Sequence, residues 1–284
     1  MRELVLGGEG LIGSELVEML DGRGHEAISL DIKSGCDLRN AGAEPFENCD
    51  RVWFLAWDTG GAKYIGAPDK QHQMFKHNCE LSSRVFDILS RTKKPFLFVT
   101  SQLAGQPNAY GMTKLMAERW AGQLGGKIAR LWNTYGWESP DARSHVITDC
   151  VLSALETGTI RLMTNGRERR RFIYKSDCVA ALVRIFDGQL DYADIAGGEW
   201  LTIRQVAEEV SSQLGAIVEM GTSDGEELIV DPMNPPPDWT PAVSFADGVA
   251  KVIADARRFL NKEEKEDSRP TVMRSGFTQP HAAD

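Results

Sequence analysis

Residues 4–16 read LVLGGEGLIGSEL and place Gly7, Gly10 and Gly13 between a short apolar run and an amphipathic segment. A strand, a glycine turn and a helix in this order let the backbone approach a pyrophosphate, which the helix N-terminus binds through its amides. A tight turn with nothing bound is the alternative, and the position of the motif after a first strand favours a dinucleotide. The residues assigned to this loop are Gly7, Gly10, Leu11, Ile12 and Gly13.

Asp31 lies at the end of the second apolar run, AISLDI (27–32), where a carboxylate can hydrogen-bond the ribose of an adenosine. The charge of this carboxylate would repel a 2′-phosphate, so we expect NAD to bind in preference to NADP. An ordinary surface acid is the competing interpretation.

Further along the chain, short apolar runs alternate with helix-length amphipathic segments near 14–21, 71–90 and 110–124. The runs are ELVLGG (3–8), AISLDI (27–32), RVWFLAW (51–57), PFLFVTS (95–101) and KIARLWN (127–133). This alternation indicates βαβ units, and it predicts an α/β fold with a Rossmann-type, doubly wound parallel sheet.

The alternation loosens after residue 133, where TYGWESPDARSH (134–145) predicts a loop. We therefore expect an NAD-binding Rossmann domain over 1–133, completed by later segments near 172–200. A smaller C-terminal α/β lobe over 134–260 is expected to bind the substrate. Residues 261–284 are charged and then polar with prolines, which predicts a mobile tail.

Composition excludes several classes of protein. The 284 residues carry a net charge of −9, and the only basic run is RERRR (167–171), which argues against nucleic acid or an anionic membrane surface as a partner. The five cysteines are scattered without C-x-x-C spacing, so neither disulfides nor a metal site is expected. Without a signal-peptide pattern or an apolar stretch of about 18 residues, the chain is expected to be cytoplasmic.

The segment NAYGMTKLMAERW (108–120) places Tyr110 and Lys114 one helical turn apart, on the same face of a helix. An ammonium near a phenol favours phenolate, and such a tyrosine can exchange the proton of a sugar hydroxyl. Ser101 ends the run PFLFVTS at the carboxyl edge of the expected sheet and supplies a third polar group. The alternative is that Tyr110 is a core residue and Ser101 a turn residue.

With these motifs in order, residues 2–260 resemble the extended short-chain dehydrogenase/reductase superfamily, in particular its NAD-dependent sugar-nucleotide epimerase/dehydratase family. The matching elements are the glycine loop, CDLRN (36–40), FLAW (54–57), TSQ (100–102), YGMTK (110–114), RLWNTYG (130–136) and NGRERRRFIYKSDCVAAL (165–182). The resemblance implies catalytic roles for Ser101, Tyr110 and Lys114, cofactor contacts for Asp37, Leu38, Leu55, Ala56, Asn78, Tyr110 and Lys114, and substrate contacts for Gln102, Asn133 and Arg170.

The Arg170 assignment also has support from the residues alone, because adjacent guanidinia in an acidic protein suit bidentate capture of a diphosphate. A solvated basic turn is the alternative.

Some segments depart from the resemblance. Gln102 and Leu103 follow Ser101 where dehydratases of the family carry an acid, so a 4,6-dehydratase is disfavoured. WDTGGAKYI (57–65) is similar to a glycine-rich segment of the GDP-mannose 3,5-epimerase type, and RSHVI (143–147) is similar to the stretch with the catalytic histidine of GDP-fucose synthase. His145 is therefore a candidate second acid/base, or else a residue that only packs or caps the start of a helix.

The sequence thus predicts an NAD-dependent epimerase of a nucleotide-activated sugar that acts through a transient keto sugar, with Tyr110 as the base. A nucleotide keto-sugar reductase or dehydrogenase, or a dehydratase, is the enzymatic alternative. A non-catalytic NAD-binding regulatory protein is the other. The resemblance also implies a homodimer formed through the helices near Asn78 and Tyr110. The sugar, its nucleoside and the carbon that reacts stay open.

Overall fold

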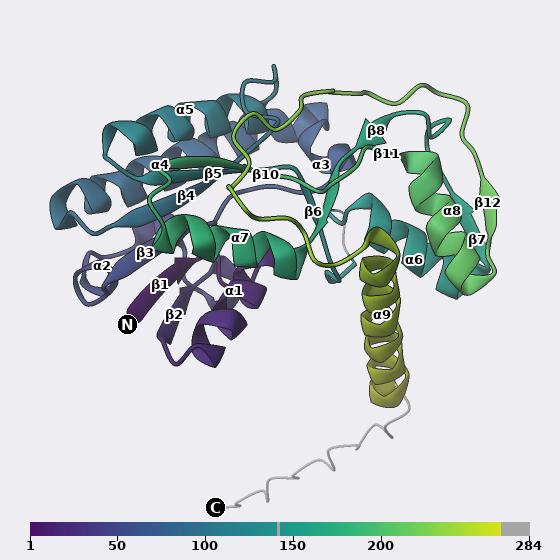
Figure 1. The fold of residues 1–284 in the computed structure, drawn as a ribbon, viewed down its shortest axis with the longest axis horizontal. Helices are drawn as coiled ribbons and strands as arrows, with labels where there is room; N and C mark the ends of the chain where they lie inside the picture. The colour runs from purple at the N-terminus through teal and green to yellow at the C-terminus, as the bar shows by residue number, and fades with distance from the viewer. Residues whose placement is uncertain (141–142, 268–284) are drawn as a thin grey trace, which may run out of the picture.

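A six-stranded parallel sheet forms the centre of the protein (Figure 1). The computed structural model describes residues 1–140 and 143–267, with side chains up to residue 261. The strands are β1 (Arg2–Leu6), β2 (Glu26–Leu30), β3 (Arg51–Phe54), β4 (Phe96–Ser101), β5 (Lys127–Leu131) and β10 (Tyr192–Ile195), in the order β10-β5-β4-β3-β1-β2. The predicted Rossmann-type sheet is therefore confirmed.

The strand order reverses at β1, because the chain goes from β1 outward to β2 and then returns to the other side of β1 at β3. Doubly wound sheets bind ligands at the carboxyl ends of the strands that flank such a switch point. The glycine loop follows β1, and the segment from Leu55 onward follows β3.

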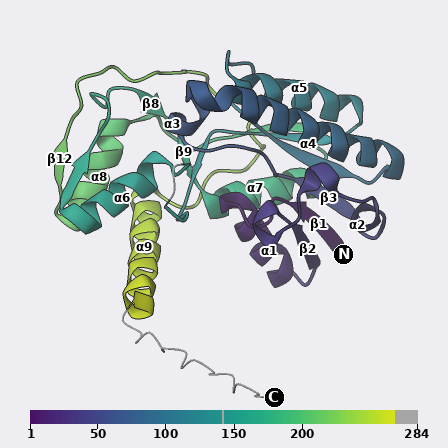
Figure 2. The ribbon, with the colours of Figure 1, turned by 180° about the vertical axis from the view of Figure 1, so that it is seen from behind.

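Helices cover both faces of the sheet, as Figures 1 and 2 show. On one face lie α1 (Leu11–Gly22) and α7 (Lys175–Asp187), and on the other lie α4 (Gln71–Thr92) and α5 (Ala109–Gln123). Successive strand residues alternate between the two cores: Phe54 and Phe98 pack toward α4 and α5, whereas Trp53 and Leu97 pack toward α1 and α7. Because both faces are buried, the strands read as continuous apolar runs.

Residues beyond β5 build a second lobe with its own hydrophobic core, in which Tyr135, Val151, Val206 and Val252 are buried. Its elements are β6 (Asn133–Tyr135), α6 (Val146–Thr157), β7 (Thr159–Arg161), β8 (Arg169–Arg170), β9 (Phe172–Tyr174), β11 (Leu201–Thr202), α8 (Ile203–Leu214), β12 (Ile217–Glu219) and α9 (Phe245–Asp267). The chain returns to the first unit with α7 and β10, which adds an edge strand to the sheet beside β5.

Short elements complete the first unit. They are the turns η1 (Ile32–Ser34), η2 (Leu38–Asn40) and η3 (Pro68–Lys70) and the helices α2 (Glu44–Glu47) and α3 (Ala62–Ile65).

A long segment between β12 and α9, residues 220–244, runs along the β10 edge of the sheet; we call it the strap (Figure 1). The carboxylate of Asp194 on β10 accepts hydrogen bonds from the amides of Met233 (2.7 Å) and Asn234 (3.0 Å). The indole of Trp132 donates to the carbonyl of Val230 (3.1 Å). The strap therefore joins the second lobe to the sheet without forming regular structure.

The expected tail starts at residue 261, and α9 continues to Asp267, into the first residues of that segment. The residues from 261 to 267, NKEEKED, include neither glycine nor proline, so nothing in them stops a helix. Residues 268–284 lie outside the described residues. Within the described part of the chain, no helix is both long and apolar enough to cross a membrane.

Candidate active site

The glycine loop begins with a residue that no other amino acid could replace without strain. Gly7 has φ +87°, and a Cβ atom there would lie 2.7 Å from the amide nitrogen of Ala56. The amides of Leu55 (3.0 Å) and Ala56 (2.8 Å) both donate to the carbonyl of Leu6, which holds the segment after β3 against the loop. The loop is thus as tight as a pyrophosphate site requires.

Gly10 and Gly13 differ in their surroundings. Gly10 is the N-cap of α1, and a Cβ atom there would meet only the Gly7 carbonyl oxygen, at 3.4 Å. At Gly13 the same atom would lie 2.0 Å from that oxygen, so this glycine lets α1 pack on the turn. The first-turn amides of α1, which include those of Leu11 and Ile12, have no partner within the helix and remain available to an anion.

Asp31 lies beside this loop, at the end of β2. Its carboxylate accepts hydrogen bonds from the amides of Glu9 (3.0 Å) and Lys33 (2.9 Å). A carboxylate has about four acceptor positions, so two remain for ribose hydroxyls. The position and remaining capacity of Asp31 both fit the adenosine end of NAD.

Asp37 and Leu38, the next two cofactor candidates, both contact other residues of the protein. The guanidinium of Arg39 binds both carboxylate oxygens of Asp37, with a closest contact of 2.6 Å, and these hydrogen bonds hold the pKa of Asp37 below its usual value. Leu38 is buried in the core between the sheet and α4. A contact of either residue with adenine stays a proposal.

The side chain of Asn78 on α4 binds the backbone of the segment that follows β3. The side chain is fully buried, accepts from the amide of Asp58 (2.8 Å) and donates to the carbonyl of the same residue (3.2 Å). Asn78 therefore fixes the segment that borders the cofactor loop.

Ser101, Tyr110 and Lys114 meet at the carboxyl edge of β4. Burial raises the pKa of Tyr110, and the nearby side chains of Ser101 and Thr59 oppose that rise. The Ser101 Oγ atom accepts a hydrogen bond from the amide of Leu103 (3.1 Å). The side chain of Asn108 caps α5 by accepting a hydrogen bond from the amide of Gly111 (2.8 Å). The helix therefore begins at Ala109, one residue before Tyr110.

Lys114 is only 3% exposed. Its Nζ atom donates to the carbonyl of Val99 (2.7 Å), lies 4.3 Å from the ring centroid of Trp57 and 6.0 Å from that of Tyr110. Burial lowers the pKa of Lys114 to about 7. The lysine and the tyrosine therefore share one desolvated site.

Thr59 and Trp57 belong to this site although the sequence interpretation did not name them. Both lie in the segment WDTGGAKYI, whose similarity to an epimerase segment rests on its glycines. The sequence shows the hydroxyl of Thr59 and the indole of Trp57 close to the pair Gly60-Gly61. The spacing of these residues does not predict that either side chain lies near Tyr110.

The two segments that resemble other epimerases and reductases pack against each other. The amide of Gly61 donates to the carbonyl of Arg143 (2.8 Å), and Arg143 forms an ion pair with Asp58 (3.0 Å). His145 is the N-cap of α6, and its Nδ1 atom lies 2.9 Å from a carboxylate oxygen of Glu138. A role for His145 as an acid or base stays a proposal.

The candidate substrate contacts lie in two parts of the structure, one beside Ser101 and one at the basic segment 167–171. Gln102 lies next to Ser101, and its side-chain oxygen is buried without a hydrogen-bond partner among the described residues. Asn133 donates to the carbonyl of Arg171 (3.2 Å), which joins β6 to the basic segment. Arg170 donates to the carbonyls of Arg169 (2.8 Å) and, in the strap, Glu226 (2.5 Å).

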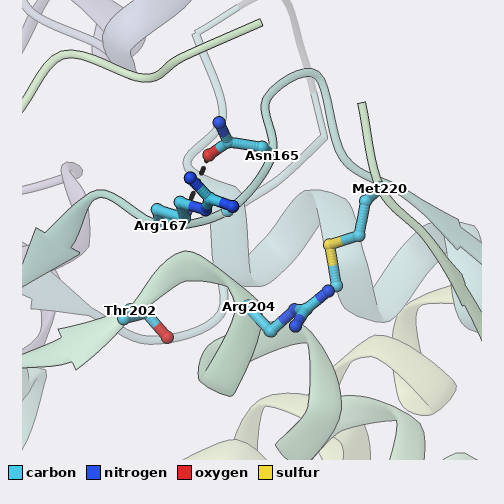
Figure 3. Close-up of a pocket in the computed structure, with 6 residues that line it drawn as sticks. Asn165, Arg167, Thr202, Arg204 and Met220 are labelled. Atoms are coloured by element: carbon cyan, nitrogen blue, oxygen red, sulfur yellow. Dashed lines mark hydrogen bonds between the residues drawn. The ribbon is translucent and has the colours of Figure 1, made fainter. Parts of the chain in front are cut away.

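Two surface hollows lie away from this site. One of them, at the N-terminus of α8, is lined by Asn165, Gly166, Arg167, Thr202, Arg204 and Met220 (Figure 3). Its volume is about 200 Å³. The other, of about 820 Å³, lies over α4 and is lined by Arg39, Asn40, Cys79, Glu80, Ser83, Arg84 and Asp87. Neither is lined by Ser101, Tyr110 or Lys114, so neither marks the candidate active site.

Comparison with known protein families agrees with this geometry. The model of the NAD dependent epimerase/dehydratase family matches residues 3–192, which is more than half of the chain. The chain belongs to this family. The resemblance expected from the sequence is confirmed, and NAD is the cofactor.

Curated relatives of this family member are similar over nearly the whole chain. UDP-glucuronic acid decarboxylase 1 of Arabidopsis thaliana is 25% identical, covering 93% of this chain and 72% of the relative. UDP-glucuronic acid decarboxylase 6 of the same plant is 26% identical, covering 93% of this chain and 91% of the relative.

Solved structures share the family fold. UDP-glucose 4-epimerase of Thermotoga maritima superposes with a TM-score of 0.76 at 21% identity, covering 92% of this chain and all of that one. UDP-glucuronic acid 4-epimerase of Bacillus cereus, solved with UDP-glucuronic acid and NAD, superposes with a TM-score of 0.77 at 18% identity, covering 91% of this chain and all of that one.

Proposed function

We propose that this family member is an NAD-dependent epimerase of a nucleotide-activated sugar that acts through a transient keto sugar. One observation carries the proposal: Ser101 and Thr59 are close enough to the phenol of Tyr110 to act on its pKa, and Lys114 lies one helical turn further on. This set lies at the carboxyl edge of the sheet, where the family's ligands are expected.

Tyr110 is proposed to take the proton of a sugar hydroxyl and later to return it. NAD, when bound, supplies the acceptor and donor of the hydride. Because burial raises the pKa of Tyr110, the phenol keeps its proton in a neutral environment, and a charged Lys114 is needed to favour phenolate. Ser101 would hold the oxygen of the sugar while the carbonyl forms.

Arg170 is the proposed contact for the nucleotide diphosphate. Its neighbours are already paired with strap carboxylates: Arg169 with Glu227 (2.9 Å) and Arg171 with Asp231 (3.5 Å). Arg170 donates to carbonyls and forms no ion pair within the residues that the structure describes. Its charge is therefore the one of the three that a diphosphate could neutralise.

A second candidate function is decarboxylation of a nucleotide-linked uronic acid. The curated relatives that favour it are UDP-glucuronic acid decarboxylases, which are similar over more than nine-tenths of this chain. Its first step would also be the oxidation of a sugar hydroxyl to a keto group. A keto group β to the carboxylate then makes the loss of CO₂ easy. Both candidates therefore place the same demand on Tyr110 and Lys114.

One experiment separates these activities. The protein would be incubated with NAD and a panel of UDP-, GDP- and dTDP-sugars that includes UDP-glucuronic acid, and products would be identified by NMR. An inverted hydroxyl supports epimerisation, whereas CO₂ and a nucleotide pentose support decarboxylation. Stoichiometric consumption of NAD indicates net oxidation, and NAD binding without turnover of any sugar nucleotide favours a regulatory protein.

We also propose that the protein is a homodimer. Met112, Met116 and Trp120 follow one another at helical spacing on α5 and are 47%, 36% and 37% exposed, and Phe75 on α4 is exposed as well. An apolar stripe on two adjacent helices is typical of a subunit interface.

A further inference from the structure

The ammonium of Lys114 is surrounded by aromatic rings. Its Nζ atom lies 4.3 Å from the centroid of the Trp57 ring and 5.0 Å from that of Phe98. Both distances are within the roughly 6 Å over which a cation is attracted to an aromatic face, and tryptophan is the strongest of the aromatic partners. Trp57 is thus the closest ring to this ammonium.

No carboxylate compensates the charge of Lys114 in the part of the chain that the structure describes, where its Nζ atom has one hydrogen bond, to the carbonyl of Val99. The titratable groups on the surrounding elements have other partners. Asp58, after β3, binds Tyr64 and Arg143, and Glu118, one turn further along α5, binds Arg130 of β5 at 2.8 Å. His77 on α4 interacts electrostatically with Asp58, and Tyr110 is the remaining titratable group near Lys114.

The backbone on both sides of Trp57 is fixed. The amide of Ala56 donates to Leu6, and Asn78 binds the amide and carbonyl of Asp58. The indole packs on Phe54 and Phe98 at centroid distances of 6.2 and 5.6 Å. The ring is therefore held in place by the fold and does not depend on Lys114 for its position.

The indole N–H of Trp57 is buried and has no hydrogen-bond partner among the described atoms. An unpaired buried donor is unfavourable, and phenylalanine would fill an apolar site without that cost. Packing alone does not account for a tryptophan here, whereas the stronger attraction of its face for a cation does.

We propose that Trp57 is a positioning residue that holds the Lys114 ammonium over its indole face and so sets the pH range in which the Tyr110–Lys114 pair works. The inference rests on the proposed function only for its kinetic consequence. If the indole stabilises the ammonium, its removal favours the neutral amine. The alkaline limit of activity then moves to lower pH, because the amine no longer favours phenolate at Tyr110.

The direct test is an NMR titration of the full-length protein as purified, with ¹³C-labelled lysine. The signal of Lys114 is assigned by its loss in Lys114→Met. We expect Trp57→Leu to lower the pKa of Lys114 by about one unit, and Trp57→Phe to lower it by less, because the phenyl face attracts a cation more weakly. The alkaline limb of the pH profile of kcat/KM should move in the same order.

Trp239→Leu is the matched control, because Trp239 packs against the α1 and α7 face of the sheet and not at Lys114. Its Lys114 titration should equal that of the unmodified protein. An unchanged or raised pKa in folded Trp57→Phe and Trp57→Leu proteins overturns the proposal. The NMR readout needs no substrate, so it decides this inference even if no sugar nucleotide is turned over and the proposed function fails.

Discussion

Three glycines of the cofactor loop, Gly7, Gly10 and Gly13, have different physical functions at the scale of single residues. Gly7 provides a positive φ, Gly13 lets the first helix pack closely, and Gly10 leaves space at the N-terminus of that helix. Only Gly10 has room for a methyl group in the protein itself. The space at Gly10 is therefore where we expect the pyrophosphate.

Gly10→Ala and Gly13→Ala should consequently fail in different ways. Gly10→Ala should keep its melting temperature but lose at least about tenfold in NAD affinity, because the new methyl group occupies ligand space. Gly13→Ala should lower the free energy of unfolding by about 1–3 kcal/mol, because its methyl group meets the Gly7 carbonyl. Calorimetry measures both quantities, and equal loss of stability in the two variants would contradict this assignment.

Asp31 is expected to decide between the two nicotinamide cofactors. Asp31→Ala should narrow the preference for NAD over NADP, because the variant no longer repels a 2′-phosphate. Asp37→Asn is the comparison: its carboxylate is already paired with Arg39, so its loss should affect both cofactors alike. Equal affinities of the unmodified protein for NAD and NADP, measured by calorimetry, would refute the role of Asp31.

At the scale of elements, β1 and β3 are joined by a buried charge pair as well as by their backbones. Glu3 is fully buried opposite Arg51, accepts from its Nε (2.6 Å) and Nη2 (2.8 Å) atoms, and also accepts from the indole of Trp53 (2.6 Å). Burial alone would raise the pKa of Glu3, but the hydrogen bonds from Arg51 and Trp53 outweigh it and the pKa is lowered.

This pair should make the fold sensitive to acid. Since the folded-state pKa of Glu3 lies below the unfolded value of 4.5, its contribution is present above about pH 4.5 and is lost as the pH falls through the folded value. Glu3→Gln should lower the free energy of unfolding by about 3–5 kcal/mol at neutral pH and flatten its decline in acid. Urea titrations at several pH values measure this effect.

Glu26→Gln is the control for this stability experiment, because Glu26 pairs with Arg2 on the exposed surface. An exposed ion pair contributes little, so the urea midpoint should hardly change. If Glu3→Gln behaved in the same way, Glu3 and Arg51 would not form the stabilising pair seen between the strands.

Local elements of the site could be predicted from the sequence, whereas contacts between distant segments could not. Ser101 ends an apolar run, and Tyr110 and Lys114 are one helical turn apart, so spacing alone predicts their common edge. Thr59 and Trp57 reach the same site because Leu6 and Asn78, on other elements, hold the loop after β3. The alternation of apolar runs and amphipathic segments predicts the fold class. The path of the strap could not be predicted, because its sequence has no helical or strand periodicity.

On the scale of the whole molecule, the apolar stripe on α5 predicts how two copies associate. Met112→Glu combined with Met116→Glu should convert the proposed dimer to a monomer, because two charges would be buried at the interface. Met233→Glu is the control, since Met233 lies in the strap and is 82% exposed. Sedimentation velocity at micromolar concentration measures the state, and a monomeric unmodified protein would refute the proposed dimer.

The fold brings the cofactor loop, the loop after β3, the end of β4 and the start of α5 to one edge of the sheet. We propose that this arrangement oxidises a nucleotide sugar through Tyr110. The most direct test is the turnover of a sugar-nucleotide substrate by Tyr110→Phe, a change that removes one oxygen and keeps the packing of the ring. We expect turnover to fall about 10²–10⁴-fold, with folding and NAD affinity unchanged. Turnover at the unmodified rate by the folded, NAD-binding variant would exclude Tyr110 as the base.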